Sequence, residues 1–402
     1  MSPTACNDVR LREGRGGSEM PIRTLSDLVT SANMADFSAA FAGKTRWHAK
    51  MPMRTGVSEL CPWPTFDALI ATGAIPADNF RVLLNAKAML KSLYVDEKGQ
   101  LRPEAIQALA AQGATLSVND IGRFVPAIGE LGAAIERELR CKTGVNAYIS
   151  FGAKSAFLAH SDAHDVLIVQ VQGVKHWRTF GTPEFFPTKG VHMGSPPPCE
   201  WEGQMTPGDL LYLPRGEVHA AVPEELPSMH LTIGIAEQTG VDFVAWLATK
   251  AEEVVALRRD LGATLSPEAR GARDRELTQA ILDLLDTATM REFEAGQAKQ
   301  RSLRPLASFG TIGRLTPASR LVSALRREVD LMDEQEGPAQ LTLGGQHFRL
   351  SLNARRALAI ITRLGSVSFG ALAESLAGRT SSSDLAQAIQ ELADKSLVAL
   401  AE

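Results

Sequence analysis

Two histidines and one aspartate stand where they could bind a single metal ion. His160 and Asp162 lie two residues apart beside an apolar stretch, and His219 follows a Pro-Arg-Gly turn farther along the chain. Because side chains alternate between the two faces of a strand, His160 and Asp162 are expected to project to the same side. Two imidazoles and one carboxylate are the ligand set of non-haem Fe(II) sites, which keep three coordination positions open for a cosubstrate and O2. The spacing therefore predicts an iron site that supports oxidation.

Each of these residues also has a plainer interpretation. The two histidines could be hydrogen-bonded core residues, and Asp162 could cap a turn. His164 continues the same alternation and competes as a ligand, but it stands one step beyond the pair, so a structural role is expected. His176 is expected at the surface or in packing, and Trp177 in the core. The combination of three ligand types in strand and turn contexts favours the metal site.

The elements that must position these residues are strands. The stretch from Ala159 to Gly181 predicts two strands joined by a turn at Gln172-Gly173, the second carrying Lys175. A Pro-Gly-Asp turn at 207–209 leads into the apolar strand that precedes His219. Further strands are predicted near 145–151 and 228–235. On the first of these strands, Asn146 and Tyr148 lie on one face, and their polar side chains could line a pocket.

The rest of the chain predicts helices at both ends of this strand-rich region. Residues 1–20 offer little to bury and are expected to be disordered. From residue 241 the apolar period changes to that of helices, including one predicted at Ala318–Met332. Helices and strands are also predicted elsewhere, at 66–71, 79–84, 103–112, 120–140, 355–364, 369–376, 384–395 and 397–400. The last three helices and the closing strand indicate a winged helix.

Composition limits the partners. The chain has 402 residues, so two or three domains are expected. It is 45% hydrophobic and 22% charged, and its net charge of −4 does not indicate binding to nucleic acid or to an anionic membrane. The region from 350 to 402 contains five basic and five acidic residues, so it lacks the excess of basic charge that is typical of a DNA-binding domain. The four cysteines lie far apart and form no Cys-x-x-Cys pair. No stretch predicts a signal peptide or a membrane span, so a cytoplasmic location is expected.

Taken together, these stretches resemble the JmjC-type, double-stranded β-helix 2-oxoglutarate oxygenases, and within them the ribosomal-protein hydroxylases. The similarity covers roughly residues 37–237. The matching stretches are His160-x-Asp162 with Asp165–Gln170, Gly173-x-Lys-His-Trp-Arg178, Pro207–Pro214 with His219, and Ser228-x-His-x-Thr232. The resemblance implies an α+β protein with a double-stranded β-helix (jelly-roll, cupin-like) JmjC catalytic domain at 21–240. A helical dimerisation domain at 241–335 and a winged-helix-like domain at 336–402 would follow.

The resemblance also implies roles for individual residues. His160, Asp162 and His219 would hold Fe(II), and Lys175 would pair with the far carboxylate of 2-oxoglutarate. A dianionic cosubstrate that binds the metal at one end needs a positive charge at the other, and a lysine on a pocket strand supplies it. The positions that would line the cosubstrate pocket are Asn146, Tyr148 and Thr232, and those that would contact substrate are His230 and Tyr148.

The function implied is that of an Fe(II)- and 2-oxoglutarate-dependent dioxygenase, active as a homodimer, which hydroxylates a protein or peptide side chain and releases succinate and CO2. A histidine or arginine of a ribosomal protein is the leading candidate target. One alternative is the same chemistry on a biosynthetic peptide or a free amino acid, decided by the loop from Pro183 to Glu200. Another is a non-catalytic regulatory protein that uses the winged helix and keeps the metal for structure.

Overall fold

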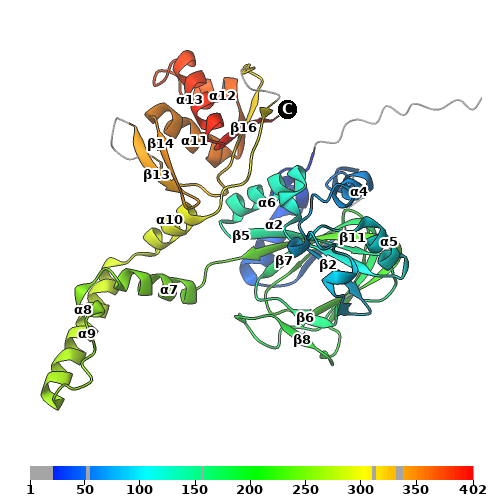
Figure 1. Cartoon of the computed structure of the whole chain (residues 1–402), viewed down its shortest axis with the longest axis horizontal. Helices are drawn as coiled ribbons and strands as arrows, with labels where there is room; N and C mark the ends of the chain where they lie inside the picture. Colours follow the sequence, from blue (N-terminus) through cyan, green and yellow to red (C-terminus); the bar gives the residue numbers. More distant parts are fainter. Residues whose placement is uncertain (1–20, 51–54, 156, 310–313, 332–337, 402) are drawn as a thin grey trace, which may run out of the picture.

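The structure is a computed structural model that describes residues 21–50, 55–155, 157–309, 314–331 and 338–401. The expected disorder of residues 1–20 lies outside the described residues. Three parts follow one another along the chain: a strand-rich body, a helical arm that projects away from it, and a compact C-terminal unit (Figure 1). No helix in the described ranges is long and apolar enough to span a bilayer.

An antiparallel sheet of 11 strands forms the body. Its main path runs β1-β10-β7-β11-β5-β4-β2-β3, while β6 pairs with β11 and β8, and β9 pairs with β7. The strands are β1 (Trp47–Ala49), β2 (Phe80–Leu84), β3 (Lys87–Ala88), β4 (Thr115–Val118), β5 (Lys142–Ser150), β6 (Ala159–Ser161), β7 (Asp165–Thr179), β8 (Val191–Met193), β9 (Trp201–Met205), β10 (Leu210–Leu213) and β11 (His219–Ala236).

Strand β7 is buried on both of its faces. Leu167 and Val169 point into the main core, whereas Val166 and Ile168 point to a second apolar cluster that contains Trp177. Alternate residues of one strand therefore serve two cores, which explains the continuous apolar run in the sequence. Because β7 and β11 pair along most of their length, they form the frame that carries Lys175 on β7 and His219 on β11.

The predicted turn at Gln172-Gly173 is wrong, because β7 continues through it to Thr179. Gly173 has φ +61°, and the register between β7 and β11 shifts opposite Glu225 and Met229. A glycine with positive φ is what a bulge in a long strand pair requires. The Gln-Gly pair therefore bends one strand instead of joining two.

The described residues of the body also contain six α-helices: α1 (Leu25–Val29), α2 (Met34–Gly43), α3 (Thr55–Ser58), α4 (Trp63–Ala71), α5 (Pro103–Ala111) and α6 (Pro126–Leu139). The single helix predicted over residues 120–140 is instead a 3-10 turn at Ile121–Arg123 followed by α6. Pro126 explains the break, since the residue before a proline is pushed out of the helical region, and Val125 is extended at φ −116°, ψ 105°.

The helical arm consists of α7 (Gly240–Ala251), α8 (Val255–Arg258), α9 (Pro267–Thr287) and α10 (Met290–Gln300). Helix α9 is capped at its start by the hydroxyl of Ser266, which accepts from the N–H of Ala269. Several large apolar side chains of the arm are exposed, namely Val241, Val244, Ile281, Leu282, Leu285 and Met290.

The C-terminal unit packs α11 (Leu352–Leu364), α12 (Phe369–Ser375) and α13 (Ser382–Asp394) against two small sheets, and these three helices confirm the sequence prediction. One sheet has the order β15-β12-β16, and the other is the hairpin β13-β14. Their bounds are β12 (Arg320–Ser323), β13 (Ala339–Leu343), β14 (Gln346–Leu350), β15 (Ser366–Ser368) and β16 (Val398–Ala401).

The helix predicted at Ala318–Met332 is wrong, because Arg320–Ser323 is the central strand of the three-stranded sheet. Both of its partner strands come from residues beyond 365, so the local apolar period could not reveal the pairing. This strand, expected within the helical block of 241–335, therefore belongs to the C-terminal unit.

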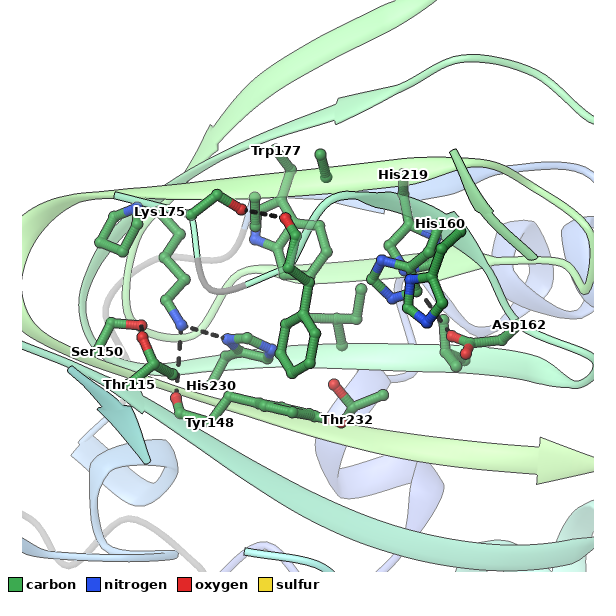
Figure 2. Close-up of a pocket in the computed structure, with 18 residues that line it drawn as sticks. Thr115, Tyr148, Ser150, His160, Asp162, Lys175, Trp177, His219, His230 and Thr232 are labelled. Carbon is green, nitrogen blue, oxygen red and sulfur yellow. Dashed lines mark hydrogen bonds and ion pairs between the residues drawn. The ribbon is translucent and has the colours of Figure 1, made fainter. Parts of the chain in front are cut away.

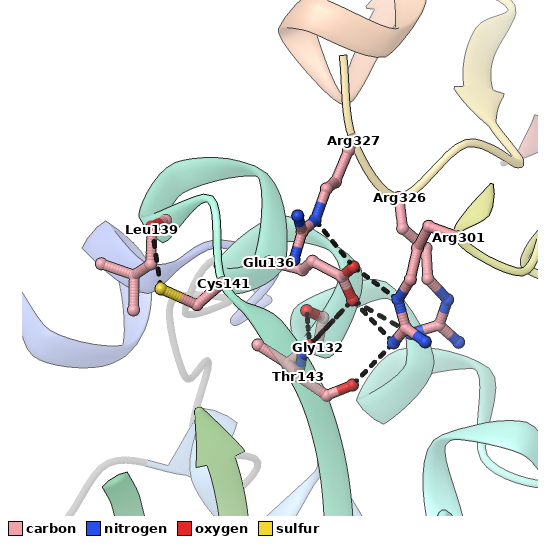
Figure 3. Close-up of polar contacts among 8 residues, drawn as sticks. All are labelled: Gly132, Glu136, Leu139, Cys141, Thr143, Arg301, Arg326 and Arg327. Atoms are coloured by element: carbon pink, nitrogen blue, oxygen red, sulfur yellow. Dashed lines mark hydrogen bonds and ion pairs between the residues drawn. The ribbon is translucent and has the colours of Figure 1, made fainter. Parts of the chain in front are cut away.

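A buried carboxylate joins this unit and the end of the arm to the body. Glu136 of α6 is fully buried and accepts from Arg301 at 2.6 and 3.0 Å and from Arg327 at 3.3 Å (Figure 3). Arg326 lies 3.8 Å away. A second ion pair joins Glu130 of the same helix to Arg320 of β12 at 2.6 Å. Helix α6 thus anchors the region that follows the arm.

Candidate metal centre

The side chains of His160, Asp162 and His219 converge at one point of the body. One ligand atom from each lies within 4.8 Å of the others, and His219 Nε2 is 3.8 Å from Asp162 Oδ2. The cause is the register of the sheet, in which His160 of β6 pairs directly with His219 of β11. Asp162 follows the end of β6 and turns toward the two rings (Figure 2).

Both imidazoles are oriented by backbone carbonyls. His160 Nδ1 lies 3.0 Å from the carbonyl of Leu158, and His219 Nδ1 lies 2.9 Å from that of Glu217. A carbonyl only accepts, so each Nδ1 carries the proton and each Nε2 keeps a lone pair for a metal. Burial, reinforced by the neighbouring His160, lowers the pKa of His219 to about 4. The residues present therefore fit a divalent ion in donor type, tautomer and charge.

Residues that the sequence analysis did not single out hold this arrangement. Arg46 donates to Glu217 at 2.9 Å and to Thr179 at 2.7 Å, which ties the turn before His219 to β7. Asp165 accepts from Tyr212 and from the backbone N–H of Arg215, both at 2.9 Å. Only the fold brings these partners together, and no local pattern marks them.

A cavity of about 220 Å³ extends from the metal-binding side chains to Lys175. Figure 2 shows Lys175 and the trio of His160, Asp162 and His219 at opposite ends, with His230 between them. The lining residues are Thr115, Tyr148, Ser150, Ser155, Phe157, His160, Asp162, Val166, Ile168, Lys175, Trp177, His192, His219, Ala220, Ala221, Pro223, His230 and Thr232.

Lys175 carries a buried amine that has no anionic partner among the described residues. It is 2% exposed, and its Nζ lies 2.7 Å from His230 Nδ1 and 3.4 Å from the carbonyl of Tyr148. Within the described ranges, no carboxylate lies within ion-pair distance of it. Burial lowers the pKa of Lys175 to about 7. A buried ammonium is costly unless it is paired, so this end of the cavity is suited to an anion.

The other predicted pocket residues lie on the neighbouring strands β5 and β11. Register pairs His230 with Tyr148 and Thr232 with Asn146. Tyr148, His230 and Thr232 line the cavity, but Asn146 does not. Its Oδ1 accepts from the N–H of Asp120 at 3.1 Å, so Asn146 joins β5 to the residue that precedes the 3-10 turn.

Several lining residues were missed from the sequence. Thr115 and Ser150 share a hydrogen bond of 3.1 Å near Lys175, and His192 of β8 lies beside His160 with ring centroids 5.5 Å apart. A hydroxyl within an apolar strand gives no signal, and His192 sits in the proline- and glycine-rich loop that the sequence could not resolve. His164, the competing ligand, is outside the trio and packs against Gly234.

Residues 123–243 match the JmjC domain family. The ribosomal oxygenase YcfD from Escherichia coli, solved with cobalt and 2-oxoglutarate, is similar to this chain with a TM-score of 0.60 and 15% identity, over 92% of this chain and 99% of that one. A YcfD structure with cobalt and succinic acid gives a TM-score of 0.59 and 16% identity over the same shares.

Among curated proteins, the chain is similar to enzymes named bifunctional lysine-specific demethylase and histidyl-hydroxylase NO66. The protein from Drosophila persimilis is 24% identical over 301 residues, which are 70% of this chain and 43% of that protein. The one from Dictyostelium discoideum is 26% identical over 216 residues, 48% and 41% of the two chains. The chain spans less than half the length of these relatives. The matched region, the antiparallel sheet and the shared architecture together show a JmjC domain at residues 123–243 within a cupin-like, YcfD-like fold.

Proposed function

We propose that the chain is an Fe(II)- and 2-oxoglutarate-dependent oxygenase that hydroxylates a protein side chain. One observation carries the proposal: a cavity ends in a three-residue metal-binding set on one side and in a buried, unpaired lysine on the other. A dicarboxylate that reaches from metal to lysine fits both ends. Proteins of the same fold have been solved with cobalt and 2-oxoglutarate or succinic acid, which supports this assignment.

His160, Asp162 and His219 would hold the iron, and the carbonyls of Leu158 and Glu217 keep their rings in the binding orientation. Lys175 would pair with the distal carboxylate of the cosubstrate, while Tyr148 and Thr232 shape the wall between the two ends. With iron and 2-oxoglutarate bound, the site would consume O2, release succinate and CO2, and supply the oxidising power for hydroxylation. The apolar walls made by Val166, Ile168 and Trp177 exclude water from the site.

The proposed substrate is a protein side chain, with a histidine or arginine of a ribosomal protein as the leading candidate. The names of the similar proteins support this choice, since one is a ribosomal oxygenase and the others are histidyl-hydroxylases. Intact masses of ribosomal proteins from the host, with and without this protein, would identify the target by the gain of one oxygen. The alternative substrates, a biosynthetic peptide or a free amino acid, predict unchanged ribosomal masses.

Asp162→Ala tests the catalytic proposal. Loss of one of three ligands should lower succinate release from 2-oxoglutarate by about 100-fold or more, because the remaining two imidazoles hold iron weakly. Glu374→Gln, an exposed change on α12, is the matched control and should keep full activity. If neither the unaltered chain nor the control releases succinate with Fe(II), the alternative of a non-catalytic regulatory protein is favoured.

The helical arm is proposed to form a homodimer. Its exposed apolar side chains on α7 and α9 suit a second copy of the same surface. Light scattering should give twice the chain mass for the unaltered protein and a single-chain mass for the double variant Val244→Glu, Ile281→Glu. A monomeric unaltered protein would contradict this proposal.

The C-terminal unit is proposed to be winged-helix-like, with three helices and a small sheet, and to bind no nucleic acid. The balance of basic and acidic residues supports the second point. A cytoplasmic location stays a prediction.

A further inference from the structure

A second cavity lies at the seam between the body and the stretch that follows the arm. It has a volume of about 360 Å³, and its walls come from the 3-10 turn at Ile121–Arg123, from α6 and β5, and from residues beyond α10. None of its lining residues is shared with the cavity of the candidate metal centre. Its polar lining side chains are Asp120, Arg123, Thr143, Arg301, Ser302 and Arg326.

Guanidinium groups outnumber carboxylates in this second cavity. Arg123, Arg301 and Arg326 line it together with a single carboxylate, that of Asp120. Asp120 and Arg123 are exposed, whereas the side chain of Arg326 is only 18% exposed. Positive charge that is taken out of water is costly unless it is paired, so the buried part of this cavity is suited to an anion.

Glu136 lies next to the cavity but does not satisfy both of its buried arginines. Its oxygens accept from Arg301 at 2.6 and 3.0 Å and from Arg327 at 3.3 Å. Arg326 comes only to 3.8 Å, beyond hydrogen-bond distance, and its buried Nε has no hydrogen-bond partner among the described residues (Figure 3). Burial lowers the pKa of Arg326, and the charge of Arg301 adds to this effect. Arg326 is therefore the cation of the cluster that most needs a further anion.

We propose that this second cavity binds a phosphate group, free or carried by a nucleotide, with Arg326 as its main buried contact. A phosphate carries about two negative charges on one compact group, which matches the excess of three guanidiniums over one carboxylate. The planar fork of an arginine suits phosphate oxygens. Arg123, and the hydroxyl of Ser302, which donates to no described residue, supply further donors. Because the lining comes from both sides of the seam, bound phosphate joins the two parts.

Two substitutions beside Glu136 separate the cavity from the cluster next to it. Arg326→Gln removes a guanidinium that lines the cavity, whereas Arg327→Gln removes one that bonds to Glu136 but is absent from the lining. We expect Arg326→Gln to weaken phosphate binding by about tenfold or more, the effect of losing a hydrogen bond to a charged group. Arg327→Gln should stay within about threefold of the unaltered chain. Arg123→Gln, an exposed change in the same lining, should weaken binding by about fivefold.

The measurement is calorimetric titration of the full chain in chloride buffer, first with inorganic phosphate and then with adenosine monophosphate. Tighter binding of adenosine monophosphate assigns the phosphate to a nucleotide, and equal or weaker binding assigns it to the free ion. Acetate, with one charge and two oxygens, should bind at least about tenfold more weakly than phosphate. Lys175→Gln removes the buried amine of the other cavity and should bind phosphate like the unaltered chain.

Several results would overturn the proposal. One is the absence of binding up to about 10 mM phosphate, and another is equal affinity for acetate and phosphate. Equal affinity of Arg326→Gln and the unaltered chain would also overturn it, as would equal weakening by Arg326→Gln and Arg327→Gln. Loss of phosphate binding in Lys175→Gln would place the ion in the other cavity. If circular dichroism shows that Arg326→Gln does not fold, Arg123→Gln decides, and unchanged affinity in that variant contradicts the proposal.

Discussion

At the scale of single residues, the site depends on which groups carry charge. Burial lowers the pKa of Lys175 to about 7, so this amine is largely uncharged above that pH when no ligand is present. The titratable groups that face it stay neutral there, because burial lowers the pKa of His230 and raises that of Tyr148. Lys175 is therefore the group that changes charge between pH 7 and 9.

This gives a pH dependence with a definite sign. A carboxylate beside Lys175 stabilises the ammonium and raises its pKa, so binding takes up a proton when the free amine is neutral. Affinity for 2-oxoglutarate should be constant below pH 7 and fall by about tenfold per pH unit above it. Lys175→Arg keeps its charge over this range and should show weaker but constant affinity. A flat calorimetric profile for the unaltered chain from pH 7 to 9 would contradict the assignment.

The sequence predicted four residues that the structure brings together at one cavity, but not the residues that hold them in place. Histidine, aspartate and lysine have few possible roles beside apolar strands, and the spacing of His160, Asp162, His219 and Lys175 fits strands. Arg46 and Glu217 are ordinary surface types, and 171 positions separate them, so nothing local joins them. Asn146 was expected to line the pocket, but it is not among the lining residues, and its Oδ1 accepts from the backbone N–H of Asp120.

At the scale of elements, the bulge at Gly173 is the feature that the sequence analysis misinterpreted. A Cβ added at Gly173 would lie 2.5 Å from the carbonyl oxygen of Pro227 and 2.6 Å from that of Glu225. Apolar periodicity marks strands, but it does not show whether a glycine ends a strand or bends it. Because β7 pairs with β11 on both sides of Gly173, this glycine bends the strand and does not end it.

Gly173→Ala should therefore lower the free energy of unfolding by about 1–3 kcal/mol, from the clash and the positive φ together. It should also weaken 2-oxoglutarate binding, because Lys175 lies two residues farther along the same strand. Gly194→Ala is the matched control, since an added Cβ there meets nothing within 4 Å. Urea unfolding measures both variants. Equal midpoints for the two would exclude the close approach at Gly173.

At the scale of the whole molecule, Glu136 determines how the C-terminal region is held against the body. It is buried and interacts with Arg301, Arg326 and Arg327, all from the stretch that follows the arm (Figure 3). Such an arrangement is invisible in the sequence, where a glutamate on a helix is normally a solvated residue. The contacts between the parts of the chain could not be predicted from the sequence.

Glu136→Gln should release this region from α6. Removing the charge leaves several guanidinium groups without a carboxylate in a buried place, which costs about 3–5 kcal/mol. Limited proteolysis should then cut between residues 301 and 331 much faster, while metal binding by the body stays unchanged. The control Glu374→Gln, at an exposed position on α12, should be cleaved at the same rate as the unaltered chain. Equal cutting rates for Glu136→Gln and this control would show that the cluster does not hold the parts together.

The central claim is that one cavity binds a metal ion at one end and a dicarboxylate that reaches from this metal to Lys175 at the other end. A crystal structure with Mn(II) and 2-oxoglutarate, prepared without O2, tests it most directly. The account predicts the metal between His160, Asp162 and His219, and the distal carboxylate against Lys175. A metal bound by other side chains, or a cosubstrate that leaves Lys175 without an anionic partner, would contradict it.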